Sequence, residues 1–460
     1  MRRVSSIHSR RGVALIGPHP RQHGDPTTPR TAPSSPSIID RTMRTDEHIL
    51  EMARQAASAA RALARLSAET KNLILQQMAQ GILQHDEAIL TANARDLQAG
   101  QAGGLSHAML DRLRLDHQRL EAMAEGLCQV SRLPDPVGHE LSVVRRPNGL
   151  IIRKVRVPLG VVAVIYESRP NVTADAAGLC FKAGNAAILR GGSEATHSND
   201  AILDAMLAVG RREGLPNHAI QLVKTTDHEA VHALLQLEQY IDLVIPRGGE
   251  SLIRAVAEHS KVPVLKHYKG VCHVYVDRAA DLDMALKIVI NAKCQRPGVC
   301  NAMETLLVHD EIASAFLPRV AQELISHGVE LRGDERTCGL IAQAQSATHQ
   351  DWSEEYLDLI AAVRVVGDLE AAIDHIQRYG THHSDVIVTA DENAAQRFTH
   401  EVDSATVYVN ASSRFTDGYE FGMGAEIGIS TGKLHARGPC GLEELTTYKY
   451  IIQGTGQVRQ

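Results

Sequence analysis

Short apolar runs alternate with segments of helical length along most of the chain, and this alternation limits the possible folds more than any other feature. Strands separated by helices build βαβ units, which form largely parallel sheets. A first series of buried strands is predicted at 161–166, 185–190, 219–223, 241–246, 262–266 and 272–277. A second series is predicted at 304–309, 361–366, 384–390 and 405–410. We therefore predict two α/β domains, with residues 291–303 at their junction.

The segment before the first series has a helical pattern, from about residue 45 to residue 132, with Ser67 as a candidate N-cap. Residues 141–160 break this pattern. Alternating residues flank Asn148 and Gly149, a dipeptide that favours a two-residue hairpin turn. The charged strands of the hairpin suit an arm that leaves the domain. We expect the hairpin and the tail "YIIQGTGQVRQ" to pair across a subunit interface, giving a homo-oligomer.

The composition is that of an ordinary globular protein. The 460 residues are 44% hydrophobic and 22% charged, and the net charge of −6 argues against nucleic-acid binding. No apolar run reaches the ~18 residues that cross a bilayer, so no membrane association is expected. The seven cysteines are odd in number and lack metal-type spacing, which favours free thiols in the reducing cytoplasm. His382 and His383 are expected in a surface loop, and no metal site is predicted.

Residues 1–44 differ from the rest of the chain. They are rich in Arg, Ser, Pro and Thr and contain only two acidic residues, so they are predicted to be disordered. Such a composition is also typical of a transit peptide. The density of proline disfavours the amphipathic helix of a transit peptide, and instead favours a disordered extension or a translation start at Met43.

Two glycine-rich turns follow predicted strands, in "LRGGSEATHSN" (189–199) and "PRGGESLI" (246–253). Neither fits the dinucleotide pattern G-x-G-x-x-G, and plain strand-to-helix turns of this kind are common. Their shared form favours a cofactor site, because such turns bring backbone N–H groups to phosphates. The arginines could also bind the extra phosphate of NADP. The candidate cofactor residues are Arg190, Gly191, Gly192, Ser193, Arg247, Gly248 and Gly249.

The stretch "NAKCQRPGVCNAMETLLVH" (291–309) contains two candidate nucleophiles, Cys294 and Cys300. Cys300 follows a Pro-Gly-Val turn, where backbone N–H groups can lower a thiol pKa and hold an oxyanion. Cys294 closes an amphipathic segment and is expected to pack. The pattern therefore favours Cys300. Four further cysteines are expected to be inert buried thiols, namely Cys128, Cys180, Cys272 and Cys338.

Long stretches of the chain resemble the gamma-glutamyl phosphate reductase family of the aldehyde dehydrogenase superfamily. The resemblance runs from about residue 46 to residue 453 and rests on residues 160–195, 240–253, 291–309, 401–430 and 433–451. It implies two α/β domains of aldehyde dehydrogenase type with a protruding β-hairpin arm. It also implies NADPH-dependent reduction of L-glutamyl 5-phosphate to L-glutamate 5-semialdehyde through a cysteine thioester, in L-proline biosynthesis. Residues 1–44 are too few for a kinase, so a separate glutamate kinase is the expected partner.

The resemblance also implies roles for single residues. The last cysteine of "QRPGVC", Cys300, matches the family's nucleophile. Glu355 lies where the superfamily places a carboxylate on the nicotinamide ribose, and Asn171 is the nearest counterpart of its oxyanion-binding Asn. Arg169 is a candidate ligand for the substrate phosphate or carboxylate, because a guanidinium binds either with two hydrogen bonds. The alternative for Arg169 is an intramolecular ion pair.

One departure from the superfamily bears on the reaction. Hydrolytic aldehyde dehydrogenases carry a Glu-Leu-Gly-Gly-Lys motif, whose Glu activates water against the thioester. The corresponding stretch here is "VLKHYKGVCHVYV", with Lys266 and His267 and no carboxylate. A thioester that is to be reduced must survive until hydride arrives, so the missing base fits the reductive direction. Two alternatives remain: an aldehyde dehydrogenase with another substrate, and a catalytically silent member with a binding role.

The expected domain limits follow from these patterns and the resemblance. The cofactor-binding domain is expected to be built from three separate segments, and the catalytic domain from one. The predicted segments are 1–44 (extension), 45–139 (cofactor domain, helical), 140–158 (oligomerisation hairpin), 159–282 (cofactor domain), 283–425 (catalytic domain), 426–450 (return to the cofactor domain) and 451–460 (oligomerisation tail).

Overall fold

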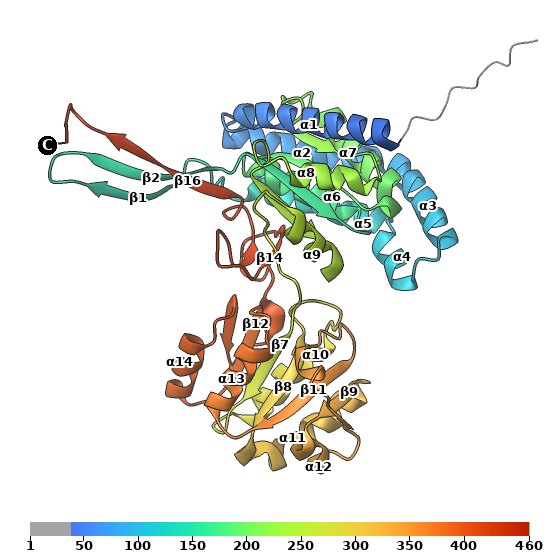
Figure 1. Ribbon diagram of the computed structural model, residues 1–460, viewed down its shortest axis with the longest axis vertical. Helices are drawn as coiled ribbons and strands as arrows, with labels where there is room; N and C mark the ends of the chain where they lie inside the picture. Colours follow the sequence, from blue (N-terminus) through green and yellow to red (C-terminus); the bar gives the residue numbers. More distant parts are fainter. Residues whose placement is uncertain (1–37, 460) are drawn as a thin grey trace, which may run out of the picture.

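The computed structural model describes residues 38–459 as two α/β domains and a protruding β arm (Figure 1). Residues 1–37, which hold most of the predicted disordered extension, lie outside the described residues. Helix α1 (Ile38–Leu63) begins within the residues that were predicted to form the extension. No helix within 38–459 combines the length and the apolar character needed to cross a bilayer.

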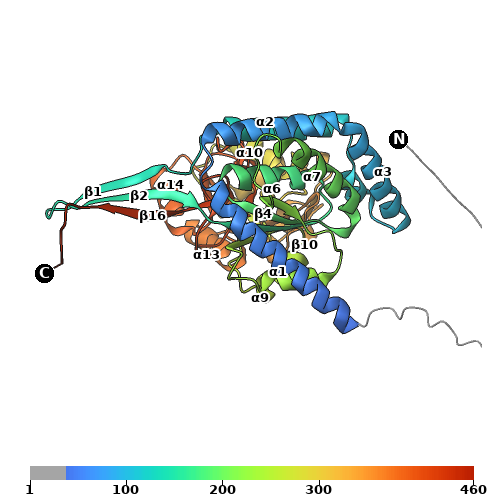
Figure 2. The same ribbon diagram turned by 90° about the horizontal axis from the view of Figure 1, so that it is seen from above.

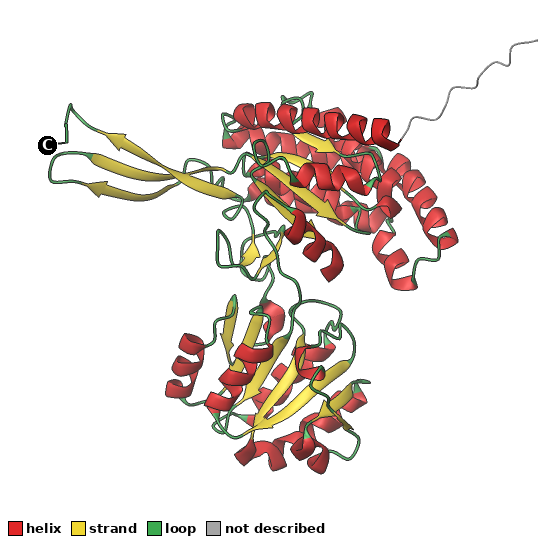
Figure 3. Cartoon of the chain, in the orientation of Figure 1, coloured by secondary structure: helices red, strands yellow, loops and turns green. Residues whose placement is uncertain are grey.

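The first domain is built on a four-stranded parallel sheet in the order β5-β4-β3-β6. All six residues of β3 are buried, which explains why its sequence is an unbroken apolar run. The four strands are β3 (Val161–Tyr166), β4 (Ala186–Arg190), β5 (Ile220–Leu222) and β6 (Leu243–Arg247). Figure 3 shows the strands gathered into one sheet with helices packed around it.

Helices cover this sheet in two groups. Helix α1 packs on β3, β4 and β5 together with α8 (His228–Leu235), and α6 (Asn171–Lys182) packs on β3 and β4. Around α6 lie α2 (Ala68–Gln84), α5 (His117–Arg132) and α7 (Thr196–Gly210). The predicted N-cap Ser67 is confirmed, because its Oγ accepts a hydrogen bond from the N–H of Thr70 at 3.2 Å. The remaining helices of the domain are α3 (Asp86–Ala102), α4 (His107–Leu113) and α9 (Glu250–His259).

The second domain is built on a seven-stranded parallel sheet in the order β10-β9-β11-β8-β7-β12-β13. Its strands are β7 (Cys272–Val276), β8 (Met303–His309), β9 (Glu330–Gly333), β10 (Gln345–Ser346), β11 (Ile360–Val366), β12 (Ser384–Val388) and β13 (Thr406–Val409). Its helices are α10 (Leu282–Cys294), α11 (Asp310–Ser326), α12 (Glu335–Leu340), α13 (Leu369–Tyr379) and α14 (Glu392–Glu401).

The position of β7 corrects the predicted domain limit. The sequence pattern placed residues 272–277 in the first series and the limit at residue 282. The structure pairs β7 with β8 and β12, so the limit falls between β6 and β7. Buried parallel strands of either sheet have the same apolar pattern, and the pattern therefore cannot show which sheet a strand joins. The predicted strand at 262–266 is reduced to one bridge, between Val264 and Val244.

After β13 the chain returns to the first domain. Strands β14 (Gly428–Ser430) and β15 (Gly438–Cys440) form an antiparallel pair. Ile427, Leu442 and Leu445 are buried in the core of the first domain. The first domain is therefore completed by residues almost 400 positions after its first helix, and the second domain is inserted between its parts.

The arm is a three-stranded antiparallel sheet in the order β1-β2-β16, which projects from the first domain in both views (Figures 1 and 2). Its strands are β1 (Glu140–Arg145), β2 (Ile151–Pro158) and β16 (Thr446–Gln453). The tail strand β16 pairs with β2 of its own chain. The expected pairing of hairpin and tail across a subunit interface is therefore replaced by pairing within one chain.

The hairpin loop differs from the predicted two-residue turn. The N–H of Arg146 donates to the carbonyl of Leu150 at 2.8 Å, so the loop comprises the three residues Pro147, Asn148 and Gly149. Only Gly149 among them has a positive φ, of 88°. A two-residue type I′ turn needs positive φ at both central residues, whereas proline fixes φ near −65° and suits the first position of a type I turn. The proline before Asn148 therefore decides the turn type.

A buried ion pair joins the end of α10 to the start of β8. The Nζ of Lys293 lies 2.6 Å from a carboxylate oxygen of Glu304, and both side chains are fully buried. The pKa of Glu304 is raised to about 7 by burial, against the opposing effect of Lys293. The other oxygen of Glu304 accepts a hydrogen bond from the N–H of Leu357 at 3.3 Å. The pair thus fixes both ends of the connection between α10 and β8.

We predict that the arm holds copies of the chain together through its outer strands. Val144 on β1 and Ile452 on β16 are 45% and 60% exposed, and their strands have free edges in the single chain. Light scattering at micromolar concentration should give at least a dimer mass, and Val144→Lys or Ile452→Lys should lower it. Val458→Lys, outside the strands, is the control. A monomeric unmodified protein would remove the prediction.

We also predict that the two partners of the buried ion pair differ in their tolerance to substitution. Glu304→Leu strands a buried ammonium and should lower the free energy of unfolding by about 3–5 kcal/mol. Lys293→Met should cost less, because the Glu304 carboxyl can take up a proton. The double variant should recover most of the loss. Urea unfolding measures all three, and equal losses in the two single variants would contradict the argument.

Candidate active site

Cys300 lies in the turn between α10 and β8, at the seam between the two domains; we call residues 295–302 the catalytic turn. The segment before β7 packs directly on it. A Cβ at Gly270 would lie 1.8 Å from the carbonyl oxygen of Cys300, so only glycine fits at this position. The Sγ of Cys272 donates to the same carbonyl at 3.2 Å. The backbone of Cys300 is thus held from the side of β7.

A second segment, which follows β13 in the chain, also holds the catalytic turn. The side-chain amide of Asn301 donates to the carbonyl of Thr416 at 2.8 Å, and the Oγ of Ser413 donates to the carbonyl of Asn301 at 2.7 Å. Arg414, in the short helix η3 (Ser413–Phe415), donates from Nε to the Oε1 of Gln295 at 2.8 Å. These bonds leave the catalytic turn little freedom to move. They therefore fix the position of the Cys300 thiol, which directly precedes Asn301 in the chain.

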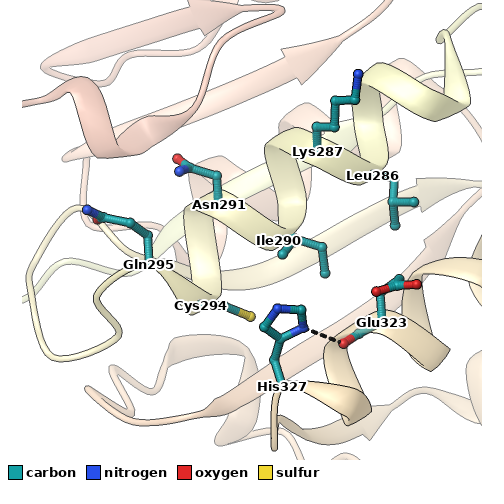
Figure 4. A pocket seen from close by; sticks show the side chains of 8 residues that line it. All are labelled: Leu286, Lys287, Ile290, Asn291, Cys294, Gln295, Glu323 and His327. Atoms are coloured by element: carbon teal, nitrogen blue, oxygen red, sulfur yellow. Dashed lines mark hydrogen bonds between the residues drawn. The ribbon is translucent and has the colours of Figure 1, made fainter.

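The two cysteines of this region have different surroundings. Cys300 is half-buried, and burial raises the pKa of its thiol to about 11, against the opposing positive charge of Arg247. Cys294 is also half-buried, and it lines a hollow between α10 and α11 of the second domain, with Leu286, Lys287, Ile290, Asn291, Gln295, Glu323 and His327 (Figure 4). Cys300 lies at the seam between the two domains, within reach of the charge of Arg247, and this position favours Cys300 as the nucleophile.

Two imidazoles lie beside the Cys300 thiol. One nitrogen of His267, one nitrogen of His383 and the Sγ of Cys300 all lie within 4.8 Å of one another. Burial lowers the pKa of His267 to about 4, assisted by the charge of Arg247, and burial beside His267 lowers the pKa of His383 to about 3. Both imidazoles are therefore neutral at pH 7.

The prediction that His382 and His383 lie in a surface loop is correct for His382 and wrong for His383. His382 is exposed with a φ of 60°, whereas His383 is fully buried at the start of β12. The signal was present in the sequence, because the buried run "SDVIV" follows His383 directly. From the sequence, His267 was noted only as a residue that stands in place of the carboxylate of hydrolytic relatives. The approach of both imidazoles to the Cys300 thiol was therefore not predicted.

Positive charge gathers around the thiol. The pKa of the Arg169 guanidinium is lowered by partial burial and by the charges of Arg247 and Arg296, and Cys300 partly offsets this shift. These four groups therefore lie in one region. The pKa of Arg414 is likewise lowered by the charge of Arg296 and raised by Cys300. Within residues 38–459 the guanidinium of Arg169 makes no hydrogen bond or ion pair, and the alternative of an ion pair is thus not met there. Arg169 is available to bind an anion.

The other two predicted catalytic and ribose-binding residues occupy defined places. Asn171 is the first residue of α6, and its side-chain amide donates to the carboxylate of Asp175 at 2.9 Å. Glu355 lies after the short helix η2 (Asp351–Ser353), and its Oε1 accepts the N–H of Gly270 at 2.7 Å. Glu355 therefore supports the same glycine that packs on Cys300.

The first glycine-rich turn follows β4. Arg190 is only 8% exposed, and its guanidinium donates to the carbonyls of Gly191 and Thr226 at 3.0 and 3.1 Å. A Cβ at Gly191 would lie 2.0 Å from the amide nitrogen of Asn199, so close packing requires glycine there. Ser193 opens the short helix η1 (Ser193–Ala195) that follows this turn. The two hydrogen bonds of the buried Arg190 therefore hold the first glycine-rich turn in place.

The second glycine-rich turn follows β6 and opens α9. The N–H of Gly249 donates to a carboxylate oxygen of Glu167 at 2.8 Å, and a Cβ at Gly248 would lie 2.3 Å from the same oxygen. Arg247 precedes this turn, and its charge lowers the pKa values of Cys300 and His267. Arg247 was expected on the cofactor side, and the structure places it within electrostatic reach of the Cys300 thiol.

Comparisons with known proteins agree with this architecture. The model of the aldehyde dehydrogenase family matches residues 21–367. Gamma-glutamyl phosphate reductase from Moorella thermoacetica is 59% identical over 406 residues, which cover 88% of this chain and 97% of that protein. The enzyme of the same name from Carboxydothermus hydrogenoformans is 57% identical over 413 residues, covering 90% of this chain and 100% of that protein.

A solved structure supports the same assignment. The crystal structure of gamma-glutamyl phosphate reductase from Thermotoga maritima superposes with a TM-score of 0.88 at 45% sequence identity, covering 90% of this chain and 100% of that chain. The expected aldehyde dehydrogenase-type α/β fold is confirmed by this likeness and by the family match. The chain therefore belongs to the aldehyde dehydrogenase family and, within it, to the gamma-glutamyl phosphate reductases.

Proposed function

We propose that this protein reduces L-glutamyl 5-phosphate to L-glutamate 5-semialdehyde and phosphate with NADPH, through a thioester on Cys300, as the second step of L-proline biosynthesis from glutamate. The observation that carries the proposal is a fixed thiol surrounded by arginines. An acyl phosphate with an α-carboxylate brings two anionic groups to the site, and the guanidiniums around Cys300 match that charge.

In the first step the Cys300 thiol, whose pKa burial raises to about 11, gives its proton to solvent, and the thiolate attacks the acyl carbon. A carbon–sulfur bond forms, the bond to the phosphate oxygen breaks, and phosphate leaves as a stable anion. The charge of Arg247 favours the thiolate over the thiol. We propose that Arg169 binds the substrate phosphate or carboxylate, because it has no described partner of its own. We propose the Cys300 N–H and Asn171 as donors to the oxyanion, a type of contact worth about 3 kcal/mol each.

In the second step the thioester is reduced. A nicotinamide cofactor, when bound at the turns after β4 and β6, would supply the hydride for the thioester carbon, and release of the aldehyde would return Cys300 to its free form. The segment before β7 carries Lys266 and His267 where hydrolytic relatives carry a carboxylate. One oxygen of Glu355 accepts the N–H of Gly270, and one oxygen of Glu426 accepts the N–H of Gly418, so backbone donors fix the positions of both nearby carboxylates.

Members of the aldehyde dehydrogenase family bind NAD or NADP, and we propose NADP(H) for this chain. A Cβ at Gly191 or Gly248 would collide with Asn199 or Glu167, so both turns, after β4 and β6, need glycine for close packing. We propose these turns, with Ser193 and Gly192, for the cofactor phosphates. Arg190 brings a positive charge to the first turn, and Glu355 is proposed for the nicotinamide ribose.

The setting of the reaction is also proposed. All seven cysteines are free thiols, which suits a reducing compartment, and we propose the cytoplasm. A separate glutamate kinase is the proposed source of the acyl phosphate, whose reactivity favours rapid use after its formation.

The reaction is best tested in reverse, by phosphate-dependent reduction of NADP⁺ with glutamate semialdehyde. The unmodified protein should show activity that requires phosphate, and Cys300→Ala should abolish it while leaving cofactor binding intact, because the thiol forms the covalent intermediate. Cys294→Ala is the matched control and should keep most of the activity. Normal turnover by Cys300→Ala, or oxidation that does not depend on phosphate, would refute the proposal.

The cofactor preference makes a separate prediction. Arg190→Ala removes a charge and two backbone contacts beside the first glycine-rich turn, and it should raise the KM for NADPH more than the KM for NADH. Steady-state kinetics with both cofactors measure the ratio. An equal rise for both cofactors would mean that Arg190 only orders the turn and does not meet the extra phosphate.

A further inference from the structure

Three metal-binding side chains converge at one edge of the second domain. His267 lies five residues before β7, Cys300 three residues before β8, and His383 one residue before β12. Strands β8, β7 and β12 are adjacent and parallel, so their amino ends lie side by side and bring the three side chains together. One donor atom from each lies within 4.8 Å of the other two.

Each of the two imidazoles has one nitrogen atom, Nε2, that is free to bind a ligand. The Nδ1 of His383 lies 2.9 Å from the Oγ of Ser384, while its Nε2 is buried without a hydrogen-bond partner within residues 38–459. A buried polar atom without a partner is costly and calls for a ligand. The Nδ1 of His267 lies 2.8 Å from the carbonyl of Ile429, so it carries the proton, and Nε2 has the free lone pair.

We propose that His267, Cys300 and His383 form a binding site for a divalent cation of the zinc class, which blocks the thiol reversibly. Thiolate and neutral imidazole are the ligands that Zn²⁺ prefers, and three protein ligands leave a fourth position for water. The contact of the His267 Nδ1 with a backbone carbonyl is the arrangement that orients metal-binding histidines. On binding, the sulfur–metal bond forms and the thiol proton passes to solvent.

The geometry requires a small movement. Zinc–nitrogen and zinc–sulfur bonds of about 2.1 and 2.3 Å place tetrahedral ligands roughly 3.5 Å apart, so the donor atoms must approach one another by about 1 Å. Rotation of the side chains of Cys300 and of the two histidines supplies such a movement without shifting the backbone of the catalytic turn.

The site gives the chain a means of responding to free zinc. A metal on Cys300 removes the group that forms the covalent intermediate, and a chelator restores it. This binding depends only on the three side chains, and it holds whether or not the acyl phosphate proposed above is the substrate. Its tests therefore need a measurement other than turnover.

Cobalt provides that measurement, because a cobalt–thiolate bond absorbs in the near ultraviolet. The full-length protein, freed of metal with a chelator, should bind one Co²⁺ with a thiolate band that Zn²⁺ displaces. His383→Gln should weaken binding at least tenfold, and Cys300→Ala should lose the band. His382→Asn is the control, because asparagine tolerates the positive φ of this exposed neighbour, and it should bind like the unmodified protein.

Alkylation gives a second measurement. Stoichiometric Zn²⁺ should slow the modification of Cys300 by iodoacetamide at least tenfold, as followed by mass spectrometry, and leave the modification of Cys294 unchanged. If His383→Gln does not fold, His267→Gln takes its place. A cobalt band that persists in Cys300→Ala, equal affinity in the histidine variant, or the lack of a band at millimolar cobalt would overturn the proposal.

Discussion

The buried ion pair between Lys293 and Glu304 is the constraint on which the active site depends. Two charges withdrawn from water are stable only as a pair, so the end of α10 and the start of β8 must stay together. Glu304 extends this restraint through the N–H of Leu357 to the loop that carries Glu355. Glu355 in turn binds the N–H of Gly270, which packs on the catalytic turn. The position of the thiol is therefore set by a closed chain of contacts.

The seam between the domains joins two unlike edges. The first sheet contributes the carboxyl ends of its strands, where Arg190 and Arg247 lie, and the second sheet contributes the amino ends of β7, β8 and β12. Binding residues commonly gather at the carboxyl ends of parallel strands, and the turns proposed for the cofactor lie at those ends of the first sheet. Cys300, the proposed nucleophile, lies at the amino end of β8 in the second sheet. Neither domain alone therefore holds both the thiol and the glycine-rich turns.

The sequence predicted the repeated strand–helix pattern well, because a strand buried on both faces must be apolar throughout. It could not assign β7 to its sheet, since that choice depends on which neighbour pairs with it. The preference for Cys300 came from the Pro-Gly turn before it, a local signal. The burial of His383 and the approach of Arg247 to the thiol depend on contacts between residues far apart in sequence, and no local pattern encodes such contacts.

The pairing of β16 with β2 has a consequence for the order of events during synthesis. Ile151 finds its partner Gln453 about 300 residues later in the chain, so the hairpin waits with one open edge until the last residues leave the ribosome. The first domain waits as well, because Leu442 and Leu445 belong to its core. The inserted second domain is made entirely within that interval, and the seven strands of its sheet all belong to one continuous segment, residues 272–409. It can therefore mature first and serve as the template against which the first domain closes.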